Sequence, residues 1–312
     1  MKVAIVGATG ETGRSVVHGL LNAADHFEIT ALVRVASLTK PAVKRLGDRG
    51  VRIVAADLQG PLDDLVKILH DIDVVISTIH YQSLTEEIAL STAAKAGGVQ
   101  RYVPCFWATV APRGVMQLRD AKQEILDHVQ RLRLPYTVID VGWWYQITLP
   151  RVPSGRFDYA LAMAQNMFLG DGDVPSALTD ISDVGLYAAK IISNPRTLNK
   201  KIFAYTESFT QNEVFRLVEK VTGEQPEAIK VSAAEIETKL AEVRQVSGGI
   251  NQARAQYEYF NSWGIRGDNT PECARYLGYL VADELYPDLK GRTLESYIRE
   301  VLSGHALSVY SA

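Results

Sequence analysis

Short apolar segments alternate with stretches of helical periodicity through the first half of the chain. The apolar segments are rich in Val, Ile and Ala and end at turn residues, which is typical of strands buried on both faces of a sheet. Each stretch between them is long enough for a helix that crosses over to the next parallel strand. The pattern predicts an α/β fold built on a doubly wound parallel sheet. We expect its strands at residues 2–6, 27–33, 51–56, 73–78, 101–103, 136–140 and 201–205, and its helices at 13–23, 40–47, 61–70, 84–96 and 120–131.

The regular alternation stops after residue 140, where tryptophans, prolines and glycines form a loop-rich segment. Helical patterning returns at 182–193, where Ser182 is the expected N-cap and Asn194-Pro195 the stop signal. From Asn212 onward the pattern predicts amphipathic helices without strand alternation, at residues 213–222, 233–246, 250–261 and 293–302. We therefore expect a first domain over residues 1–150, to which 180–205 return, and a smaller, mainly helical lobe over 151–179 and 206–312.

A glycine-rich loop directly follows the first expected strand and opens a helical stretch. Its Gly-x-x-Gly-x-x-Gly spacing is typical of a Rossmann-type fold, in which glycine permits a tight turn and lets backbone N–H groups approach a pyrophosphate. A glycine triplet alone is a weak signal, because glycines also relieve steric strain in loops, but the strand–loop–helix context strengthens it. We expect the first domain to bind a dinucleotide, with contacts from Gly7, Thr9, Gly10, Glu11, Thr12 and Gly13.

The end of the second expected strand carries Arg34 rather than a carboxylate. An acidic residue at this place accepts from the ribose 2′-hydroxyl of NAD, whereas a guanidinium suits the 2′-phosphate of NADP. Arg34, with Lys40 nearby, therefore predicts NADP(H) as the cofactor; the alternative is that both are solvated loop charges. Asp57, after the third strand, is expected either to accept from the adenine amino group or to form a turn.

Composition and charge exclude several classes of function. The chain has 33 basic and 36 acidic residues and a formal net charge of -3. This balance favours a small-molecule ligand over nucleic acid or an anionic membrane surface, and it does not indicate an oligomeric state. The 2 cysteines provide neither a disulfide framework nor a metal cluster, so we expect no metal site and a cytoplasmic location. We also expect no signal peptide and no membrane span.

Several segments of the chain are diagnostic in combination. They are Gly-Ala-Thr-Gly-Glu-Thr-Gly at 7–13, Leu-Val-Arg at 32–34, Asp-Val-Val-Ile-Ser at 73–77, Asp-Ile-Ser-Asp-Val-Gly at 180–185 and Asn-Pro-Arg-Thr-Leu-Asn-Lys at 194–200. With them, almost the whole chain resembles the NmrA-like and isoflavone reductase-like group of atypical short-chain dehydrogenases, which includes phenylcoumaran benzylic ether and pinoresinol-lariciresinol reductases. Residues 266–272 and 284–288 resemble the fungal branch. The resemblance implies a substrate of fungal secondary metabolism.

The resemblance also implies a catalytic lysine on the helix after the fifth strand, and Lys122 occupies that place. A lysine partly desolvated in a cleft can act as acid or base near neutral pH; the alternative is an ordinary solvated lysine. His80 is a second candidate proton donor. His80 and Tyr81 lie just past the fourth strand, where the nicotinamide ribose is expected, so either could contact cofactor or substrate. Ser77 and Thr78, directly before them, are expected to contact the cofactor.

Aromatic residues follow the fifth and sixth strands, at the carboxyl edge of the sheet where ligands of open α/β folds bind. Flat rings suit an aromatic or polycyclic substrate, although some of these residues are also expected in the core. The candidate wall consists of Tyr81, Phe106, Trp107, Trp143, Trp144 and Tyr145.

Residues 104–109 depart from the plant reductases, because Pro-Cys-Phe-Trp-Ala-Thr stands where those enzymes have a Pro-Ser-Glu-Phe-Gly-like stretch. This leaves the polarity of the substrate pocket open. We predict an NADPH-dependent reductase of an aromatic or polycyclic small molecule. Two alternatives stay open: a redox-neutral isomerase, cyclase or dehydratase on the same scaffold, and a non-catalytic NADP-sensing regulator.

Overall fold

The computed structural model describes residues 1–161, 166–245 and 251–309 of the chain. The chain folds into two compact units, of which unit 1 comprises residues 1–107, 120–139 and 182–202, and unit 2 comprises 108–119, 140–181 and 203–312. Residues 108–119 and 140–150, which the sequence analysis placed in the first domain, belong to unit 2. Both segments form hydrogen bonds within unit 2: Trp143 pairs with Leu178 in a sheet, and the Val110 N–H donates to the Asn269 side chain.

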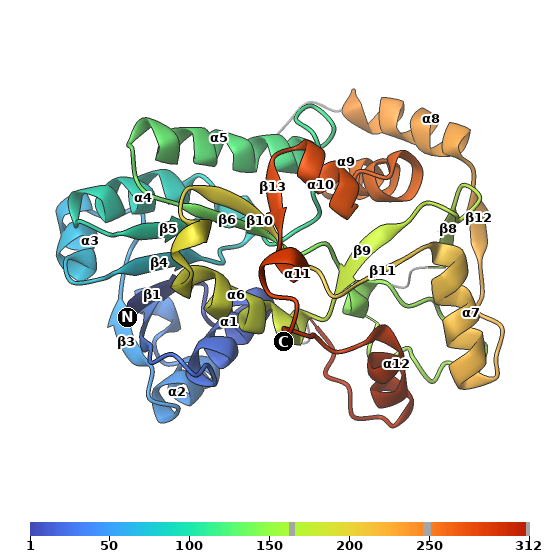
Figure 1. Cartoon of the computed structure of the whole chain (residues 1–312), viewed down its shortest axis with the longest axis horizontal. Helices are drawn as coiled ribbons and strands as arrows, with labels where there is room; N and C mark the ends of the chain where they lie inside the picture. Colours follow the sequence, from blue (N-terminus) through green and yellow to red (C-terminus); the bar gives the residue numbers. More distant parts are fainter. Residues whose placement is uncertain (162–165, 246–250, 310–312) are drawn as a thin grey trace. The chain divides into compact units, whose positions relative to one another are not determined.

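Unit 1 is built on a parallel sheet with the strand order β3-β2-β1-β4-β5 (Figure 1). β1 (Lys2–Val6) is central, between β2 (Glu28–Val33) and β4 (Val74–Ser77), whereas β3 (Arg52–Ala55) and β5 (Arg101–Val103) are outermost. A parallel bridge from Tyr102 to Tyr136 continues the sheet to β6 (Thr137–Asp140), which pairs with β10 (Lys200–Phe203). All the predicted strands are present within one or two residues, and the doubly wound α/β fold class is confirmed.

Helices cover both faces of this sheet (Figure 1). One face carries α1 (Glu11–Leu21), α2 (Pro41–Asp48) and α6 (Val184–Ser193), and the other carries α3 (Leu62–Leu69), α4 (Glu86–Ala96) and α5 (Gln117–Arg131). The strands are therefore buried from both sides, which is why their sequences are almost continuously apolar. Short 3₁₀ turns lie at Val35–Ser37, Tyr81–Ser83, Ile181–Asp183 and Pro195–Thr197.

α1 and α6 approach each other so closely that only glycine fits at their crossing. A Cβ on Gly185 would lie 1.8 Å from the Ser15 carbonyl oxygen, and one on Gly19 would lie 2.0 Å from the carbonyl carbon of Gly185. The Ser15 hydroxyl donates to the Ser182 carbonyl (2.9 Å) and accepts from the Gly185 N–H (2.9 Å). The prediction of Ser182 as N-cap is wrong: Ser182 lies in the preceding 3₁₀ turn, and Asp183 precedes the helix without a side-chain cap.

Arg101 on β5 anchors the Asn-Pro-Arg-Thr segment that follows α6. Its buried guanidinium donates to the hydroxyl oxygens of Thr137 (3.1 Å) and Thr197 (2.7 Å). It also donates to the carbonyl oxygens of Ile191 (3.2 Å) and Asn194 (3.1 Å). Both this segment and the Asp-Ile-Ser-Asp-Val-Gly segment thus hold unit 1 together.

Unit 2 combines helices with short strands. β7 (Trp143–Trp144), β9 (Ser176–Thr179) and β11 (Glu207–Phe209) form one sheet, and β8 (Met167–Leu169) pairs with β12 (Ile229–Val231). β12 and β13 (Tyr279–Val281) contradict the expectation that no strand follows residue 212, since three residues are too few to show alternation. The helices are α7 (Gln211–Thr222), α8 (Ala233–Arg244), α9 (Gln252–Tyr259), α10 (Pro271–Tyr276), α11 (Ala282–Leu285) and α12 (Leu294–Leu302), with a 3₁₀ turn at Tyr145–Ile147 and π-helical turns at Phe260–Arg266. Two predicted helix ends, at residues 246 and 250, lie outside the described residues.

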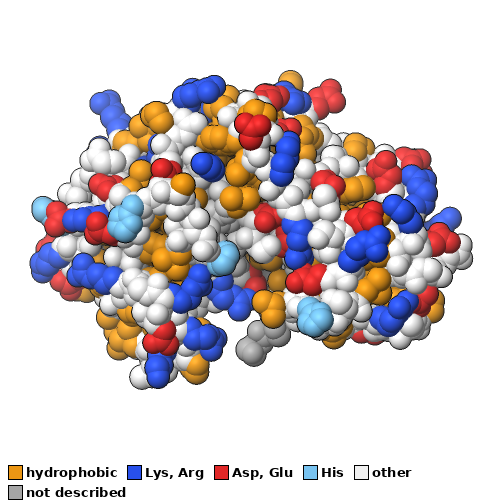
Figure 2. Space-filling view, turned by 60° about the horizontal axis from the view of Figure 1, so that its bottom comes forward, with side chains coloured by type: hydrophobic (Ala, Val, Ile, Leu, Met, Phe, Trp, Pro, Cys, Tyr) orange, Lys and Arg blue, Asp and Glu red, His pale blue; other side chains and the backbone are white. Residues whose placement is uncertain are grey.

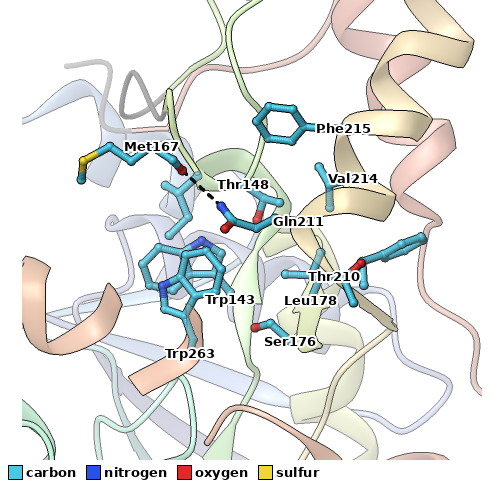
Figure 3. A pocket seen from close by; sticks show the side chains of 12 residues that line it. Trp143, Thr148, Met167, Ser176, Leu178, Thr210, Gln211, Val214, Phe215 and Trp263 are labelled. Carbon is cyan, nitrogen blue, oxygen red and sulfur yellow. Dashed lines mark hydrogen bonds between the residues drawn. The ribbon is translucent and has the colours of Figure 1, made fainter. Parts of the chain in front are cut away.

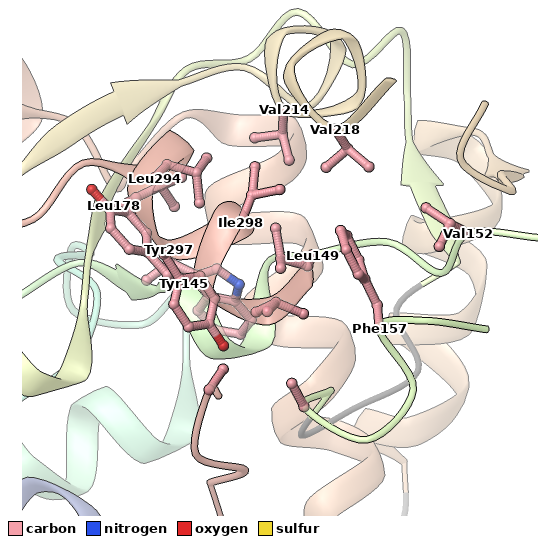
Figure 4. Packing of buried hydrophobic residues seen from close by; sticks show 14 of the residues in the cluster. Tyr145, Leu149, Val152, Phe157, Leu178, Val214, Val218, Leu294, Tyr297 and Ile298 are labelled. Carbon is pink, nitrogen blue, oxygen red and sulfur yellow. The ribbon is translucent and has the colours of Figure 1, made fainter. Parts of the chain in front are cut away.

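Aromatic and aliphatic side chains form the core of unit 2 (Figure 4). Tyr145 is fully buried in this core and stacks on Tyr297, with the ring centroids 6.1 Å apart. The Tyr145 hydroxyl donates to Glu207 (2.8 Å), which also accepts from the Leu294 N–H (2.6 Å). The core therefore ties the segment after β7 to α12.

Charged side chains of both signs are interspersed over the face seen in Figure 2. This mixture agrees with the small net charge of -3. None of the helices in the described part of the chain is long and apolar enough to cross a membrane.

Candidate functional site

The glycine loop joins β1 to α1 at the carboxyl end of the central strand. Gly7 has φ +82°, and a Cβ there would lie 2.4 Å from the Thr78 carbonyl oxygen. A Cβ on Gly13 would lie 2.1 Å from the Gly7 carbonyl oxygen, so the fold itself requires glycine at both positions. Gly10 is different, because a Cβ there would meet only the Gly7 carbonyl oxygen, at 3.3 Å. Thr9 and Gly10 are exposed, so the outer side of the loop can receive a ligand.

α1 begins without a side-chain cap. Gly10 is its N-cap residue and forms no side-chain cap hydrogen bond. Glu11 in the first turn forms an ion pair with Arg14, and Thr12 is half-buried. An uncapped helix start with its positive dipole end suits an anion such as a pyrophosphate.

Arg34, Lys40 and Asp57 follow the carboxyl ends of β2 and β3 and are all exposed. Arg34 immediately precedes the turn Val35–Ser37, and Lys40 immediately precedes α2. Asp57 Oδ1 accepts from the Gln59 N–H (3.0 Å), so Asp57 forms the turn that the sequence indicated as one of its two roles. Arg34 and Lys40 are therefore both accessible to solvent.

Burial decreases along the chain from the last residue of β4, Ser77, to the turn that begins at Tyr81. Ser77 is buried, and its carbonyl accepts from the Trp107 indole N–H (2.8 Å). Thr78 donates from its hydroxyl to the Val6 carbonyl (2.8 Å), which joins the ends of β4 and β1. His80 is exposed and its Nδ1 accepts from the Gln82 N–H (3.4 Å), while Tyr81 is half-buried with its ring centroid 4.3 Å from that of His80.

Lys122 lies on α5 and is buried, with 7% of its surface exposed. Its Nζ donates to the Phe106 carbonyl oxygen. Lys122 is therefore not the solvated surface lysine that the sequence left open. Its ammonium is desolvated next to a neutral acceptor, in the same unit as the glycine loop.

Residues 104–107 form the tight turn that presents this carbonyl. The Phe106 N–H donates to the Pro104 carbonyl (2.8 Å), and the Trp107 N–H donates to the Ile139 carbonyl (3.0 Å). Trp107 has φ +38°, a conformation that side-chain-bearing residues rarely adopt. The side chains of Phe106 and Trp107 are 1% and 4% exposed. Both predicted wall residues are therefore packed inside the protein, and they shape the turn.

Glu87, which the sequence analysis did not single out, lies next to this turn. It is 1% exposed, and its carboxylate accepts from the Tyr102 hydroxyl (2.7 Å) and the Cys105 N–H (3.2 Å). Burial raises the pKa of Glu87 to about 7, although these hydrogen bonds and the charge of Lys122 lower it. The sequence contains no signal for this site, because Glu86 and Glu87 both look like ordinary acidic residues in the first turn of a helix.

Two tryptophans of unit 2 line a small cavity (Figure 3). The ring centroids of Trp143 and Trp263 are 5.6 Å apart, and the Tyr259 ring lies 5.3 Å from that of Trp143. The cavity measures about 20 Å³, and Ser176 and Gln211 are among its polar lining residues. Trp263 is 7% exposed, and its indole N–H has no hydrogen-bond partner within the described part of the chain.

The other two residues of the Trp-Trp-Tyr segment lie elsewhere. Trp144 is half-buried, and Tyr145 is part of the core of unit 2. Trp263 lies two residues beyond the expected helix at 250–261, in a stretch for which the sequence predicts no element. The π-helical turns at Phe260–Arg266, which often mark functional sites, are visible only in the structure.

Comparison with known proteins confirms the resemblance seen in the sequence. A model of the NmrA-like family matches residues 1–298. Asnovolin J 5',6'-dehydrogenase of Aspergillus novofumigatus is 49% identical, over 97% of this chain and 96% of its own. A phenylcoumaran benzylic ether reductase of Betula pendula is 28% identical, over 96% of this chain and 98% of its own. A leucoanthocyanidin reductase–NADPH complex from Vitis vinifera has the same fold, with a TM-score of 0.80 at 23% identity, covering 97% of this chain and 100% of that chain.

Proposed function

Because the chain belongs to the NmrA-like family, we propose that it is an NADP(H)-dependent oxidoreductase acting on an aromatic or polycyclic small molecule. The observation that carries the proposal is the buried ammonium of Lys122, held against the Phe106 carbonyl in the unit that contains the glycine loop. The relative with 49% identity is named a dehydrogenase of asnovolin J, which supports redox chemistry on a secondary metabolite.

The residues of unit 1 fit a dinucleotide. The uncapped start of α1 suits the pyrophosphate, and the open position at Gly10 lets that group approach the backbone. Arg34 is exposed at the end of β2, where a guanidinium can bind the 2′-phosphate of NADP through two parallel hydrogen bonds. Thr78 and Ser77 keep the ends of β1 and β4 in place beneath the loop.

Lys122 is the proton donor or acceptor in this mechanism. A bound nicotinamide supplies or accepts the hydride. An ammonium carries three N–H groups, so Lys122 can keep its bond to the Phe106 carbonyl while it donates to a substrate oxygen. In the reductive direction it stabilises and protonates the oxygen on which charge develops, and in the oxidative direction its neutral form accepts the proton. His80 stays a second candidate, at the exposed turn after β4.

Trp143, one of the expected wall residues, lines a cavity of unit 2 together with Trp263. Their rings lie together beside the cavity in Figure 3, and both belong to the buried core of unit 2. The indole N–H of Trp263, which has no hydrogen-bond partner among the described residues, can donate to a small polar group in this cavity. A cavity of about 20 Å³ admits one small polar group and not a ring system.

Replacement of Lys122 tests the proposed function. Lys122→Ala should lower kcat by roughly 100-fold or more, while the affinity for NADPH changes less. Lys122→Arg should not restore activity, because a guanidinium does not release its proton near neutral pH. Activity is measured from the absorbance of reduced nicotinamide with polycyclic and phenolic substrates, asnovolin J among them.

The matched control is Lys95→Ala, since Lys95 is an exposed lysine on α4. Wild-type turnover in both Lys122 variants would contradict the role of Lys122. A product formed without nicotinamide turnover would indicate a redox-neutral enzyme instead. NADP binding without turnover of any substrate would indicate a regulator.

A further inference from the structure

We infer that Glu87 is a positioning residue: its carboxylate fixes the start of the segment 105–106, whose end binds Lys122, and its negative charge favours the protonated form of that lysine. The inference rests on the proposed function, in which Lys122 handles the proton. It concerns a buried acid that the mechanism above does not use.

The two charged groups hold the two ends of one short segment. Glu87 accepts from the N–H of Cys105, with both carboxylate oxygens 3.2 Å from the nitrogen. Lys122 donates to the carbonyl of the next residue, Phe106. A shift of the Cys105 peptide would therefore move the carbonyl that orients the Lys122 ammonium.

The surrounding bonds leave this segment little freedom. Within the turn, the Phe106 N–H donates to the Pro104 carbonyl (2.8 Å). On its far side the Trp107 indole donates to the Ser77 carbonyl (2.8 Å). Loss of the Glu87 acceptor would leave the buried Cys105 N–H without this partner, a costly change that the turn could relieve only by moving.

The charge on Glu87 is poised to change near neutral pH. Burial raises its pKa to about 7, and the groups that face the carboxyl and lower its pKa are Tyr102 from β5, the Cys105 N–H, Lys122 from α5 and Ser77 from β4. Burial and the charge of Glu87 raise the pKa of Tyr102 well above its usual value, so Tyr102 stays a neutral donor. Glu87 and Lys122 are thus the groups of this cluster whose charges oppose each other.

A carboxylate is not needed to hold the turn. The amide oxygen of a glutamine could accept from Tyr102 and from the Cys105 N–H, without the desolvation of a charge. A glutamine would thus keep the two hydrogen bonds but remove the negative charge on which Lys122 acts.

Glu87→Gln separates the charge from the hydrogen bonds. We expect the alkaline limit of the kcat profile to move to lower pH by about one unit, because the ammonium loses its opposite charge. The KM for NADPH should not change. Glu86→Gln is the matched control, since it removes the same charge from the adjacent position of α4, where Glu86 accepts from the exposed Gln59 (3.0 Å). Tyr102→Phe removes a hydrogen bond that favours the ionised form of Glu87. It should move the alkaline limit of the kcat profile to lower pH as well, but by less than Glu87→Gln does.

A readout without turnover distinguishes this inference from the proposed function. Lysine labelled at its ε-carbon gives an NMR titration of Lys122, assigned with Lys122→Met. We expect its midpoint to fall by about one pH unit in Glu87→Gln and to stay in place in Glu86→Gln. Equal midpoints in wild type and Glu87→Gln would overturn the inference, as would an unchanged kcat profile in an enzyme that Lys122→Ala inactivates. If Lys122→Ala kept full activity, the proposed catalytic role would fail, whereas a shifted NMR midpoint would still support the pairing of Glu87 with Lys122.

Discussion

Arg34 is the residue on which the choice of cofactor depends. It is exposed at the end of β2, so a 2′-phosphate can reach it without rearrangement of the fold. Arg34→Ala should weaken NADPH binding by about 1.5 to 3 kcal/mol, which is roughly tenfold or more, because a charge-assisted bond is lost. Binding of NADH should change little. Calorimetric titration of both nucleotides checks this, and Lys40→Ala, which removes a neighbouring point charge, should have the smaller effect.

An Arg34→Ala variant that still preferred NADPH would remove Arg34 from this role. The preference would then have to come from another cation at the end of β2.

Glu87 makes a second prediction at the scale of one residue, on stability. Its pKa is raised from 4.5 to about 7 in the folded protein, so the folded state holds this proton more tightly than the unfolded state does. The resulting stabilisation is complete below pH 4.5 and is lost as the pH rises to about 7. Over this window the free energy of unfolding of the wild type should fall relative to Glu87→Gln by about 3 kcal/mol.

Urea unfolding of both proteins at a series of pH values measures this difference. Glu86→Gln should parallel the wild type, since Glu86 is not fully buried. A constant difference between wild type and Glu87→Gln across the window would show that Glu87 titrates normally.

The crossing of α1 and α6 is the element-scale feature that most constrains the sequence. Gly185→Ala should destabilise the protein by about 3 kcal/mol or more, because the new methyl group would overlap the Ser15 carbonyl and the helices must separate. Gly47→Ala in α2 is the matched control, since its Cβ would lie 3.9 Å from Ile53. It should instead stabilise by about 0.5 to 1 kcal/mol through helix propensity. Thermal unfolding of the two variants and the wild type measures these changes in stability. Equal changes in both variants would mean that α1 and α6 can move apart without cost.

Elements also show where prediction from sequence succeeded. The strands of unit 1 were predicted within one or two residues, since each is flanked by a turn signal and buried on both faces. The strands of unit 2 were missed, because β8 and β12 have three residues each and pair across 62 positions of the chain, as with Met167 and Ile229. A pairing of that kind leaves no local periodicity.

At the scale of the whole molecule, cofactor binding should couple to stability. A ligand that binds only the folded protein, at about 100 times its dissociation constant, should raise the free energy of unfolding by about 2.7 kcal/mol. We expect this of NADPH, and less of NADH at equal concentration. In Gly10→Val the effect should disappear while the fold survives, because a side chain at Gly10 meets only one backbone oxygen at 3.3 Å but would obstruct the pyrophosphate.

Urea unfolding with and without nucleotide tests this prediction. Gly13→Ala is the contrasting variant, since its Cβ would lie 2.1 Å from the Gly7 carbonyl oxygen and should destabilise the fold itself. A stable Gly10→Val protein with undiminished NADPH stabilisation would show that the nucleotide does not contact this loop closely.

The sequence by itself determined the doubly wound sheet, the glycine loop at the end of β1 and the place of Arg34 at the end of β2. Each of these depends on neighbouring residues, whose turn geometry and apolar pattern are written locally. Only the tertiary structure decided which side chains lose water. It buried Lys122 and Glu87 around one turn, packed Phe106 and Tyr145 into the interior, and brought Trp263 beside Trp143, although 120 positions separate the two along the chain. Burial and proximity of this kind arise from contacts between distant segments. Glu86 and Glu87 are adjacent glutamates, and only such contacts bury Glu87 more deeply than Glu86.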